Sequence, residues 1–173
     1  MILEKIIIIT ALLISYFLQT SIDFFRLGSI KPDFILLITT YFAIYRGEFI
    51  GLWVGYIGGL LLDINLGTMA SMDNNTIRQY IGINAIPKAV CGYLAGKVSR
   101  NFNKDNTISW VAIIFSLTLL KGIMTFLLTS IFYNSMAAQT IITVILPEAF
   151  YTSALSIFWF KFLYWAIPPL QTQ

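Results

Sequence analysis

Histidine is absent from the 173-residue sequence, cysteine occurs once, and charged residues make up only 11% of the chain. The lack of histidine excludes Ser-His catalytic arrangements and imidazole metal sites, the commonest uses of that side chain. The single cysteine, Cys91, lies in an apolar run and excludes an internal disulfide and a cysteine metal cluster. We expect it to be a small buried packing residue, and we expect no metal and no cofactor.

Charge is also scarce for a soluble protein, in which about 25% of the residues are charged. Hydrophobic residues instead make up 58% of the chain and recur in runs long enough to cross a bilayer. The sequence therefore predicts a polytopic integral membrane protein, formed as a single transmembrane domain over residues 1–173. Residues 6–25 follow a short charged start, as in a signal peptide, but no small-x-small cleavage site follows them. We interpret them as a retained first transmembrane helix.

Short polar or glycine-containing breaks divide the chain into about six candidate helices, which predicts an all-α bundle. The second helix has about 14 residues, or ~21 Å of length, so it is either tilted or a partial, re-entrant span. Pro147 falls inside the sixth helix and should kink it. The predicted helices cover residues 4–25, 33–46, 48–66, 77–99, 107–132 and 139–166.

The distribution of lysine and arginine predicts the orientation of these helices in the membrane. With both termini in the cytoplasm, six basic residues near helix ends face inward and three face outward. The strongest cluster, residues 96–104, is either a topology anchor or a contact for anionic lipids or a cytoplasmic partner. The inward set is Lys5, Arg46, Lys97, Arg100, Lys104 and Lys161, and the outward set is Arg26, Lys31 and Arg78.

Glycines recur at four-residue steps in two of the apolar segments. Steps of four advance a helix by about 400°, so Gly51, Gly55 and Gly59 form one stripe, and Gly92 and Gly96 repeat the device. A strip without side chains lets another helix backbone approach closely, where dispersion contacts drive association in lipid. The two strips either face each other within the bundle or accept the single helix of a partner protein.

Several charged residues fall within the predicted spans, where charges are costly and are usually paired or functional. Asp63 lies about 40° around the helix from Gly59, so we expect it to be buried against protein. Lys88 is its first-choice partner and Lys121 the second, while Glu148 is an alternative partner for Lys121. We interpret these residues as a buried structural ion pair.

Carboxylates also suggest a membrane hydrolase, which needs two of them held together, one with a raised pKa. Asp33, Asp63 and Asp73 are the candidates. The sequence offers no other catalytic element, such as a glycine loop for phosphate or a cluster of metal ligands. We therefore predict that the protein is not an enzyme, and we keep the hydrolase as a rival class that replacing all three aspartates by asparagine would test.

A series of short motifs occurs in a specific order between residues 31 and 100. It comprises Pro32-Asp33, Arg46-Gly47, a glycine-rich helix ending in Leu-Leu-Asp at residue 63, Gly82-x-Asn-Ala and Gly-Tyr-Leu-Ala-Gly at 92–96. The order and spacing resemble those of the rod shape-determining MreD family. The segment 72–80 departs from that pattern, because it is longer and more polar than the expected link.

This resemblance implies a six-helix bundle similar to the substrate-binding subunits of energy-coupling-factor vitamin transporters. It also implies a role in the elongation machinery that directs lateral peptidoglycan synthesis at the inner membrane of rod-shaped bacteria. The implied partners are an MreC-like single-span protein, the MreB filament, a SEDS-family glycosyltransferase and a class B penicillin-binding protein. Membrane lipids and a second copy of the chain are further candidate partners, whereas nucleic acid is not.

A scaffold of this kind needs no catalytic residues, but it needs a surface for its partner. We expect that surface where small residues permit close approach and carboxylates lie at helix ends, namely around Asp33, Gly55, Gly59 and Asp63. Because the loops are short, recognition should use helix faces.

A vitamin-binding transporter subunit is the alternative function. It would need a polar and aromatic pocket that opens outward, for which the chain offers Trp53, Tyr56, Asn65, Tyr80 and Asn84. Against this alternative, the first helix lacks the Ala-x-x-x-Ala coupling pattern and has Ala11 and Ser15 instead.

Overall fold

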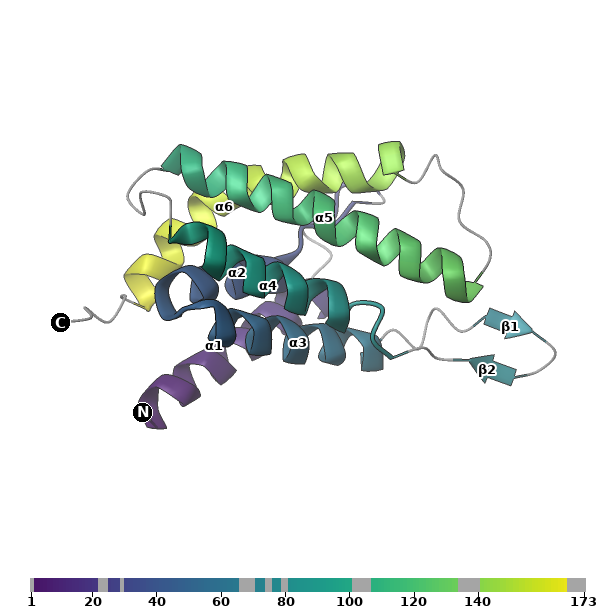
Figure 1. Ribbon diagram of the computed structural model, residues 1–173, viewed down its shortest axis with the longest axis horizontal. Coiled ribbons are helices and arrows are strands. Elements are labelled where there is room, and N and C mark those ends of the chain that lie inside the picture. Colours follow the sequence, from purple (N-terminus) through teal and green to yellow (C-terminus); the bar gives the residue numbers. More distant parts are fainter. Residues whose placement is uncertain are drawn as a thin grey trace.

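The computed structural model describes residues 2–21, 25–28, 30–65, 71–73, 76–78, 81–100, 107–133 and 141–167. Within these ranges the chain forms six α-helices, one π-helical turn and a two-stranded antiparallel hairpin (Figure 1). The predicted all-helical architecture is therefore confirmed, with the small hairpin as an addition. In chain order the elements are α1 (Ile2–Ser21), α2 (Phe34–Arg46), α3 (Glu48–Asn65), β1 (Ser71–Asp73), β2 (Thr76–Arg78), α4 (Ala85–Ser99), α5 (Thr107–Tyr133), the π-helical turn η1 (Ile141–Ile145) and α6 (Leu146–Ala166).

Helix α2 is the centre of the bundle, and its composition explains why. Residues 34–44 are mostly apolar on every side of the helix and are all buried, as expected for a helix with no polar face. The other five α-helices all contact it. Its 13 residues give a length of ~20 Å, which is short of the ~30 Å hydrocarbon core of a bilayer. The N-terminus of α2 therefore lies within the bundle, and its N-cap, Asp33, is buried there.

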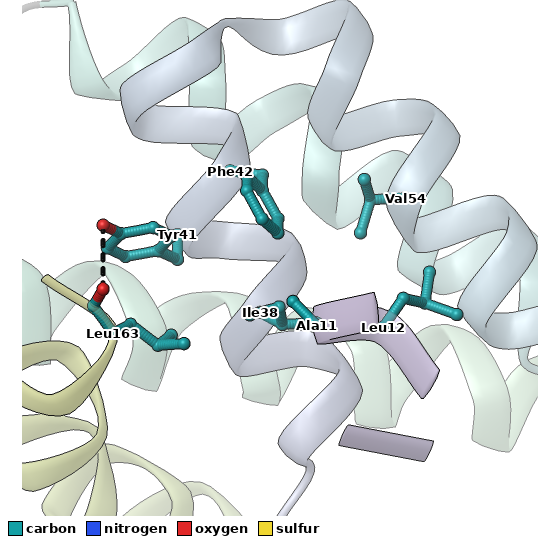
Figure 2. Close-up of a cluster of buried hydrophobic side chains, with 7 residues drawn as sticks. All are labelled: Ala11, Leu12, Ile38, Tyr41, Phe42, Val54 and Leu163. Atoms are coloured by element: carbon teal, nitrogen blue, oxygen red, sulfur yellow. Dashed lines mark hydrogen bonds between the residues drawn. The ribbon is translucent and has the colours of Figure 1, made fainter. Parts of the chain in front are cut away.

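The main apolar core packs α2 against α1, α3 and α6. The Tyr41 hydroxyl on α2 donates hydrogen bonds to the Leu163 carbonyl at 3.4 Å and the Ile167 carbonyl at 2.5 Å. The Leu163 carbonyl also accepts the Ile167 backbone N–H at 2.7 Å, and Ile167 directly follows α6, so Tyr41 joins α2 to the C-terminal end of α6. Figure 2 shows the buried cluster, which consists of Ala11, Leu12, Ile38, Tyr41, Phe42, Val54 and Leu163.

The outward faces of the helices are strongly apolar. Large hydrophobic side chains such as Phe17, Trp53 and Phe158 are more than half exposed, and similar residues occur along α1, α3, α5 and α6. A continuous apolar surface is unusual in a soluble monomer and suits contact with lipid. Among the described residues, two segments are long and apolar enough on their own to cross a membrane, Thr107–Ile131 and Ile141–Ala166. Two more, Lys5–Ser21 and Phe34–Arg46, are shorter apolar helices.

The two ends of the bundle carry different elements. In Figure 1, α1 begins and α6 ends on one side, and the β1–β2 hairpin projects from the opposite side. On the side of the helix termini, Glu48 Oε2 lies 2.8 Å from Arg100 Nη2 and joins the start of α3 to the end of α4. The connection between α2 and α3 is the single residue Gly47, whose φ of 101° is rarely adopted by other residues.

Helix α4 begins later than the sequence predicts. Its expected start was residue 77, but residues 76–78 form β2 and α4 starts at Ala85. The turn before it, residues 81–84, contains Gly82 with a φ of 112°, which interrupts a right-handed helix. The first helix is also shorter than the predicted 4–25, because α1 ends at Ser21 and Phe25 lies in a turn.

Pro147 lies in the first turn of α6 and not in its interior. The π-helical turn η1 precedes it, and regular α-helix begins at Leu146. Because η1 runs directly into α6, Pro147 lies in one continuous helix from Ile141 to Ala166, and its missing N–H falls where that helix changes from π to α. The structure has a change of helix type immediately before the proline, and the kink at this position stays a prediction.

Candidate functional site: a buried charge network and a glycine-lined helix crossing

Asp33 is the hub of a buried charge network at the N-terminus of α2. Its Oδ1 accepts a hydrogen bond from the Leu36 backbone N–H at 2.9 Å, which caps the helix. Its Oδ2 forms a buried ion pair with Lys88 of α4 and lies 3.2 Å from the Nζ of Lys121 on α5. Its own N–H donates to the hydroxyl of Thr152 on α6 at 3.3 Å. The carboxylate thus joins α2 to α4 and α5, and the backbone N–H of the same residue adds a bond to α6.

Glu148 completes the network from the first turn of α6. Its Oε1 lies 2.6 Å from Lys121 Nζ, so Lys121 bridges two carboxylates on different helices. The set contains two lysines and two acids and is formally neutral. Asp33 and Lys88 are each only 1% exposed, and Lys121 is also buried.

Burial makes this network sensitive to the loss of any one member. Taking a charge out of water costs several kcal/mol, so a buried ion is tolerated only where partners compensate it. Removing one partner leaves an uncompensated charge and typically destabilises a protein by roughly 3–5 kcal/mol. The network therefore fixes how α4, α5 and α6 are placed around the end of α2.

Asp63 accepts hydrogen bonds from backbone N–H groups and does not form the expected ion pair with Lys88. Its two carboxylate oxygens accept hydrogen bonds from the backbone N–H groups of Gly82, Asn84 and Ala85 at 2.8, 2.9 and 3.1 Å. The Asn84 side-chain amide donates a further bond at 2.9 Å. These donors include N–H groups at the N-terminus of α4, where a negative charge is favoured by the helix dipole. Asp63 therefore caps α4 from the end of α3.

The prediction that Lys88 is the first-choice partner of Asp63 is wrong. Lys88 lies against Asp33, while Asp63 is satisfied by backbone donors. Burial of Asp63 against protein, at 3% exposed, follows the expectation from its position next to Gly59. The alternative pairing of Lys121 with Glu148 is present in the structure.

The apolar sequence of α2 is a signal for the role of Asp33. A helix that is apolar on every side must be buried, so an acidic N-cap at its start must be buried too. Such a carboxylate needs a cation from a neighbouring helix. Thr152, which binds the Asp33 backbone, had no comparable signal, because threonine is common in membrane helices without any specific role.

The glycines of α3 and α4 face each other at a close crossing of the two helices. A Cβ atom added at Gly55 would overlap the backbone carbonyl of Lys88, and one added at Gly92 would overlap that of Gly51. Likewise, a Cβ at Gly59 would overlap the backbone of Ala85. Gly96 meets the backbone of Glu48 in the same way. Of the two arrangements that the sequence left open, the structure has the one within the bundle.

The expected partner surface around Asp33, Gly55, Gly59 and Asp63 is wrong, because these residues are covered inside the bundle. Gly55 and Gly59 are covered by α4, and Asp33 and Asp63 are buried and engaged inside the bundle. None of the four is accessible to another protein. Their close packing instead brings Lys88 of α4 up to Asp33 of α2, which connects the glycine strips to the charge network.

Of the residues proposed for a vitamin pocket, the three whose side chains the structure describes do not converge. Trp53 is 58% exposed on the outer face of α3 and stacks edge-on against Tyr56, which is also exposed. Asn84 is bound to Asp63. Tyr80 lies outside the described residues, and only the backbone of Asn65 is described.

Two of the carboxylates proposed for hydrolysis are engaged in separate structural roles, and only the backbone of the third is described. Asp33 lies in the lysine network, Asp63 caps α4, and Asp73 belongs to β1. Lys121 lies between Asp33 and Glu148, so each carboxylate is paired with a cation. In an acid–base pair the two carboxylates would instead share a proton. Within the described ranges, no group of three or more Cys, Asp or Glu side chains could hold a metal ion.

One family model matches the sequence, under the description "rod shape-determining protein MreD", and the match covers residues 1–167. It thus extends the resemblance seen at residues 31–100 over nearly the whole chain. No curated protein and no solved structure matches the chain.

Proposed function

The chain belongs to the MreD family of rod shape-determining proteins, and we propose that it is a non-enzymatic component of the elongation complex at the bacterial inner membrane. Family membership places it among membrane proteins with a role in rod shape. We further propose that it binds an MreC-like single-span protein and helps to regulate lateral peptidoglycan synthesis beside the MreB filament, a SEDS-family glycosyltransferase and a class B penicillin-binding protein. The family match over residues 1–167 is the observation that carries this proposal.

The proposal includes a single domain of six membrane helices with both termini in the cytoplasm. The apolar outer faces of the helices support membrane insertion. The start of α1 and the end of α6 lie on the same side of the bundle, which supports an even number of membrane spans (Figure 1). Exposed basic residues gather near that side, as the positive-inside rule requires of a cytoplasmic face; they are Lys5, Lys97, Arg100 and Lys161. The helix count also supports the proposed similarity to the substrate-binding subunits of energy-coupling-factor transporters.

The engagement of the buried charges supports a scaffold and not an enzyme. Asp33, Lys88, Lys121 and Glu148 satisfy one another at the centre of four helices. A group that holds helices together in this way is poorly placed to change its protonation state during a reaction. The molecule is built to hold its helix faces in fixed positions.

Recognition of the partner must then use the exposed helix faces. The glycine strips of α3 and α4 pack against each other, so a partner helix cannot dock on them. The faces of α1, α3, α5 and α6 present large apolar side chains, which pack against another helix as readily as against lipid.

Co-purification tests the proposal directly. The full-length chain carrying an affinity tag is expressed together with the untagged MreC-like protein of the same genome and extracted in mild detergent. We expect a stable complex of fixed stoichiometry. An unrelated single-span protein of the same membrane, expressed at the same level, serves as the control and should not be recovered.

Depletion in the native cell tests the biological role. Loss of the chain should turn rod-shaped cells into round ones, and the wild-type gene should restore the rods. Normal rods after depletion, together with no recovered complex, would overturn the proposal. Loss of vitamin uptake with normal cell shape would point instead to the transporter function.

A further inference from the structure

A cavity of about 300 Å³ lies between the C-terminal end of α2, the start of α5 and the C-terminal end of α6. Its lining comes from the last turn of α2, the first two turns of α5 and the last three turns of α6. It therefore opens on the side of the bundle where α6 ends, opposite the β1–β2 hairpin (Figure 1).

The lining of this cavity is polar near the helix ends and apolar further in. Tyr45, Thr107 and Tyr164 lie within one turn of the ends of their helices, whereas Val111 and Ile157 lie deeper. Within the described part of the chain, the hydroxyls of Thr107 and Tyr164 make no hydrogen bond. The outer part of the cavity thus offers polar groups to a ligand, and the inner part offers an apolar surface.

Lys161 gives the cavity a positive charge that no other lining residue balances. None of the described residues that line the cavity is acidic. Lys161 is exposed, and within the ranges that the structure describes it forms no ion pair. The charge of the cavity therefore favours an anion.

Aromatic rings form one wall of the cavity. The ring of Trp110 packs against those of Tyr45 and Phe160, at centroid distances of 5.6 and 5.3 Å. A site for an ammonium group needs an aromatic face open to the ligand or a carboxylate. Rings that pack on one another form a wall and not an open cage, so the cavity suits a ligand whose net charge is negative.

The position of the cavity along the helices matches the level of lipid phosphates. The segment Thr107–Ile131 is ~38 Å long, which exceeds the ~30 Å hydrocarbon core, so its ends reach into the headgroup layers. Lys161 lies five residues before Ala166 at the end of α6, or ~8 Å along the axis. From that depth a lysine stem lies along apolar surface while its ammonium reaches the headgroups.

We propose that this cavity is a binding site for the headgroup of an anionic phospholipid of the phosphatidylglycerol type. Lys161 pairs with the phosphate, and Thr107 and Tyr164 bind its oxygens or the glycerol hydroxyls. The adjoining part of an acyl chain lies against Val111 and Ile157. A zwitterionic headgroup binds more weakly, because its ammonium meets Lys161 and no carboxylate. The inference rests on insertion in a membrane, and it does not depend on the MreC-like partner.

A matched pair of charge variants tests the site. The purified full-length chain is titrated in detergent with phosphatidylglycerol or with phosphatidylcholine of the same acyl chains, and native mass spectrometry counts bound lipid. We expect Lys161→Gln to weaken phosphatidylglycerol binding about fivefold, which is the effect of one basic residue at a membrane surface. Lys161→Arg should retain the binding. Lys97→Gln removes another exposed lysine, in the last turn of α4 and outside the cavity, and should change nothing.

Equal losses from Lys161→Gln and Lys97→Gln would overturn the proposal, because they would show a general attraction of lipid to basic residues. Equal binding of the two lipids by the unaltered chain would overturn it as well, since the site would then not select an anionic headgroup.

A steric variant tests whether the lipid lies in the cavity itself. Ile157 and Phe158 are neighbours on α6, at 36% and 75% exposed, but only Ile157 lines the cavity. Ile157→Trp should fill the inner part and lower phosphatidylglycerol binding by at least about threefold, whereas Phe158→Trp should leave it unchanged. Equal binding by both variants would overturn the cavity as the site. Thermal unfolding midpoints confirm that both variants fold, and the charge variants decide the question if Ile157→Trp does not.

Glycerol phosphate separates a lipid site from a site for a soluble phosphate. It carries the same phosphate without acyl chains, so an excess of it should not displace phosphatidylglycerol, and displacement would overturn the lipid as the occupant. Recovery of the MreC-like protein is measured separately with the unaltered chain. A stable complex without lipid selectivity would overturn the lipid site alone, and lipid selectivity without a complex would overturn the proposed function alone.

Discussion

Lys121 of α5 lies 2.6 Å from Glu148 of α6, and this contact links the charge network to the helix that begins after the π-helical turn. The same Nζ is 3.2 Å from Asp33, which also holds Lys88. Two positive and two negative side chains thus balance inside the bundle. A substitution that keeps this balance should therefore be tolerated better than one that breaks it.

The first prediction compares the loss of one charge with the loss of an opposite pair. Lys121→Met leaves two carboxylates facing the single cation of Lys88, and we expect it to lower the free energy of unfolding by roughly 3–5 kcal/mol. Adding Glu148→Gln restores neutrality, because Asp33 and Lys88 then remain as a pair. The double variant should recover a large part of the loss. Thermal unfolding midpoints in the same detergent measure both, and a double variant less stable than Lys121→Met alone would contradict the prediction.

The second prediction concerns the independence of the two buried aspartates. Asp63 binds backbone donors at the start of α4, while Lys88 binds Asp33. We expect Asp63→Asn to cost about 1–2 kcal/mol through a weakened cap. Because the two side chains bind different groups, combining Asp63→Asn with Lys88→Met should be more destabilising than either change alone. A double variant that is more stable than Lys88→Met alone would show that Asp63 and Lys88 are paired.

The third prediction concerns the α3–α4 crossing. A Cβ atom at Gly55 would overlap the Lys88 backbone carbonyl, and backbone cannot move aside as a flexible side chain can. We expect Gly55→Ala to destabilise the protein by about 1–3 kcal/mol through overpacking. Ile57→Ala, two residues along the same helix on an exposed face, is the control and should have a much smaller effect. Equal unfolding midpoints for the two variants would contradict close packing at Gly55.

The sequence was most informative where a repeat in it reflects a repeat in the structure. Four-residue glycine spacing predicted close helix packing, because the α-helix places residues four apart on one side. The two strips at Gly51 to Gly59 and at Gly92 to Gly96 do pack closely, and the structure adds that they pack against each other. Which strip meets which depends on the fold of the whole chain, and spacing within one helix carries no information about that.

Ion pairing shows where sequence reasoning from a single helix reaches its limit. Asp63 and Lys88 are close in sequence and both lie in apolar segments, which made them a reasonable pair. The pairing in the structure is set by depth, because α2 is short and its N-cap Asp33 lies inside the bundle. The start of α4 was misplaced for a related reason. Gly82 breaks the helix with a positive φ, and a glycine alone does not reveal its φ in the sequence.

The last prediction concerns the joint between α2 and the end of α6. The Tyr41 hydroxyl binds the carbonyls of Leu163 and Ile167, so it ties the C-terminal end of α6 to α2. Tyr41→Phe keeps the ring in the core and removes only these bonds. It should cost about 1 kcal/mol, and the loss should be confined to the last turn of α6. Hydrogen exchange of residues 160–167 measures this directly, and it should speed up while exchange in α3 and α4 stays unchanged.

Tyr93→Phe is the matched control for that experiment, because Tyr93 is a partly buried tyrosine whose ring contacts Phe49 far from α6. Removing the Tyr93 hydroxyl should leave hydrogen exchange at residues 160–167 unchanged. Unchanged exchange at residues 160–167 in the Tyr41→Phe variant would contradict the prediction.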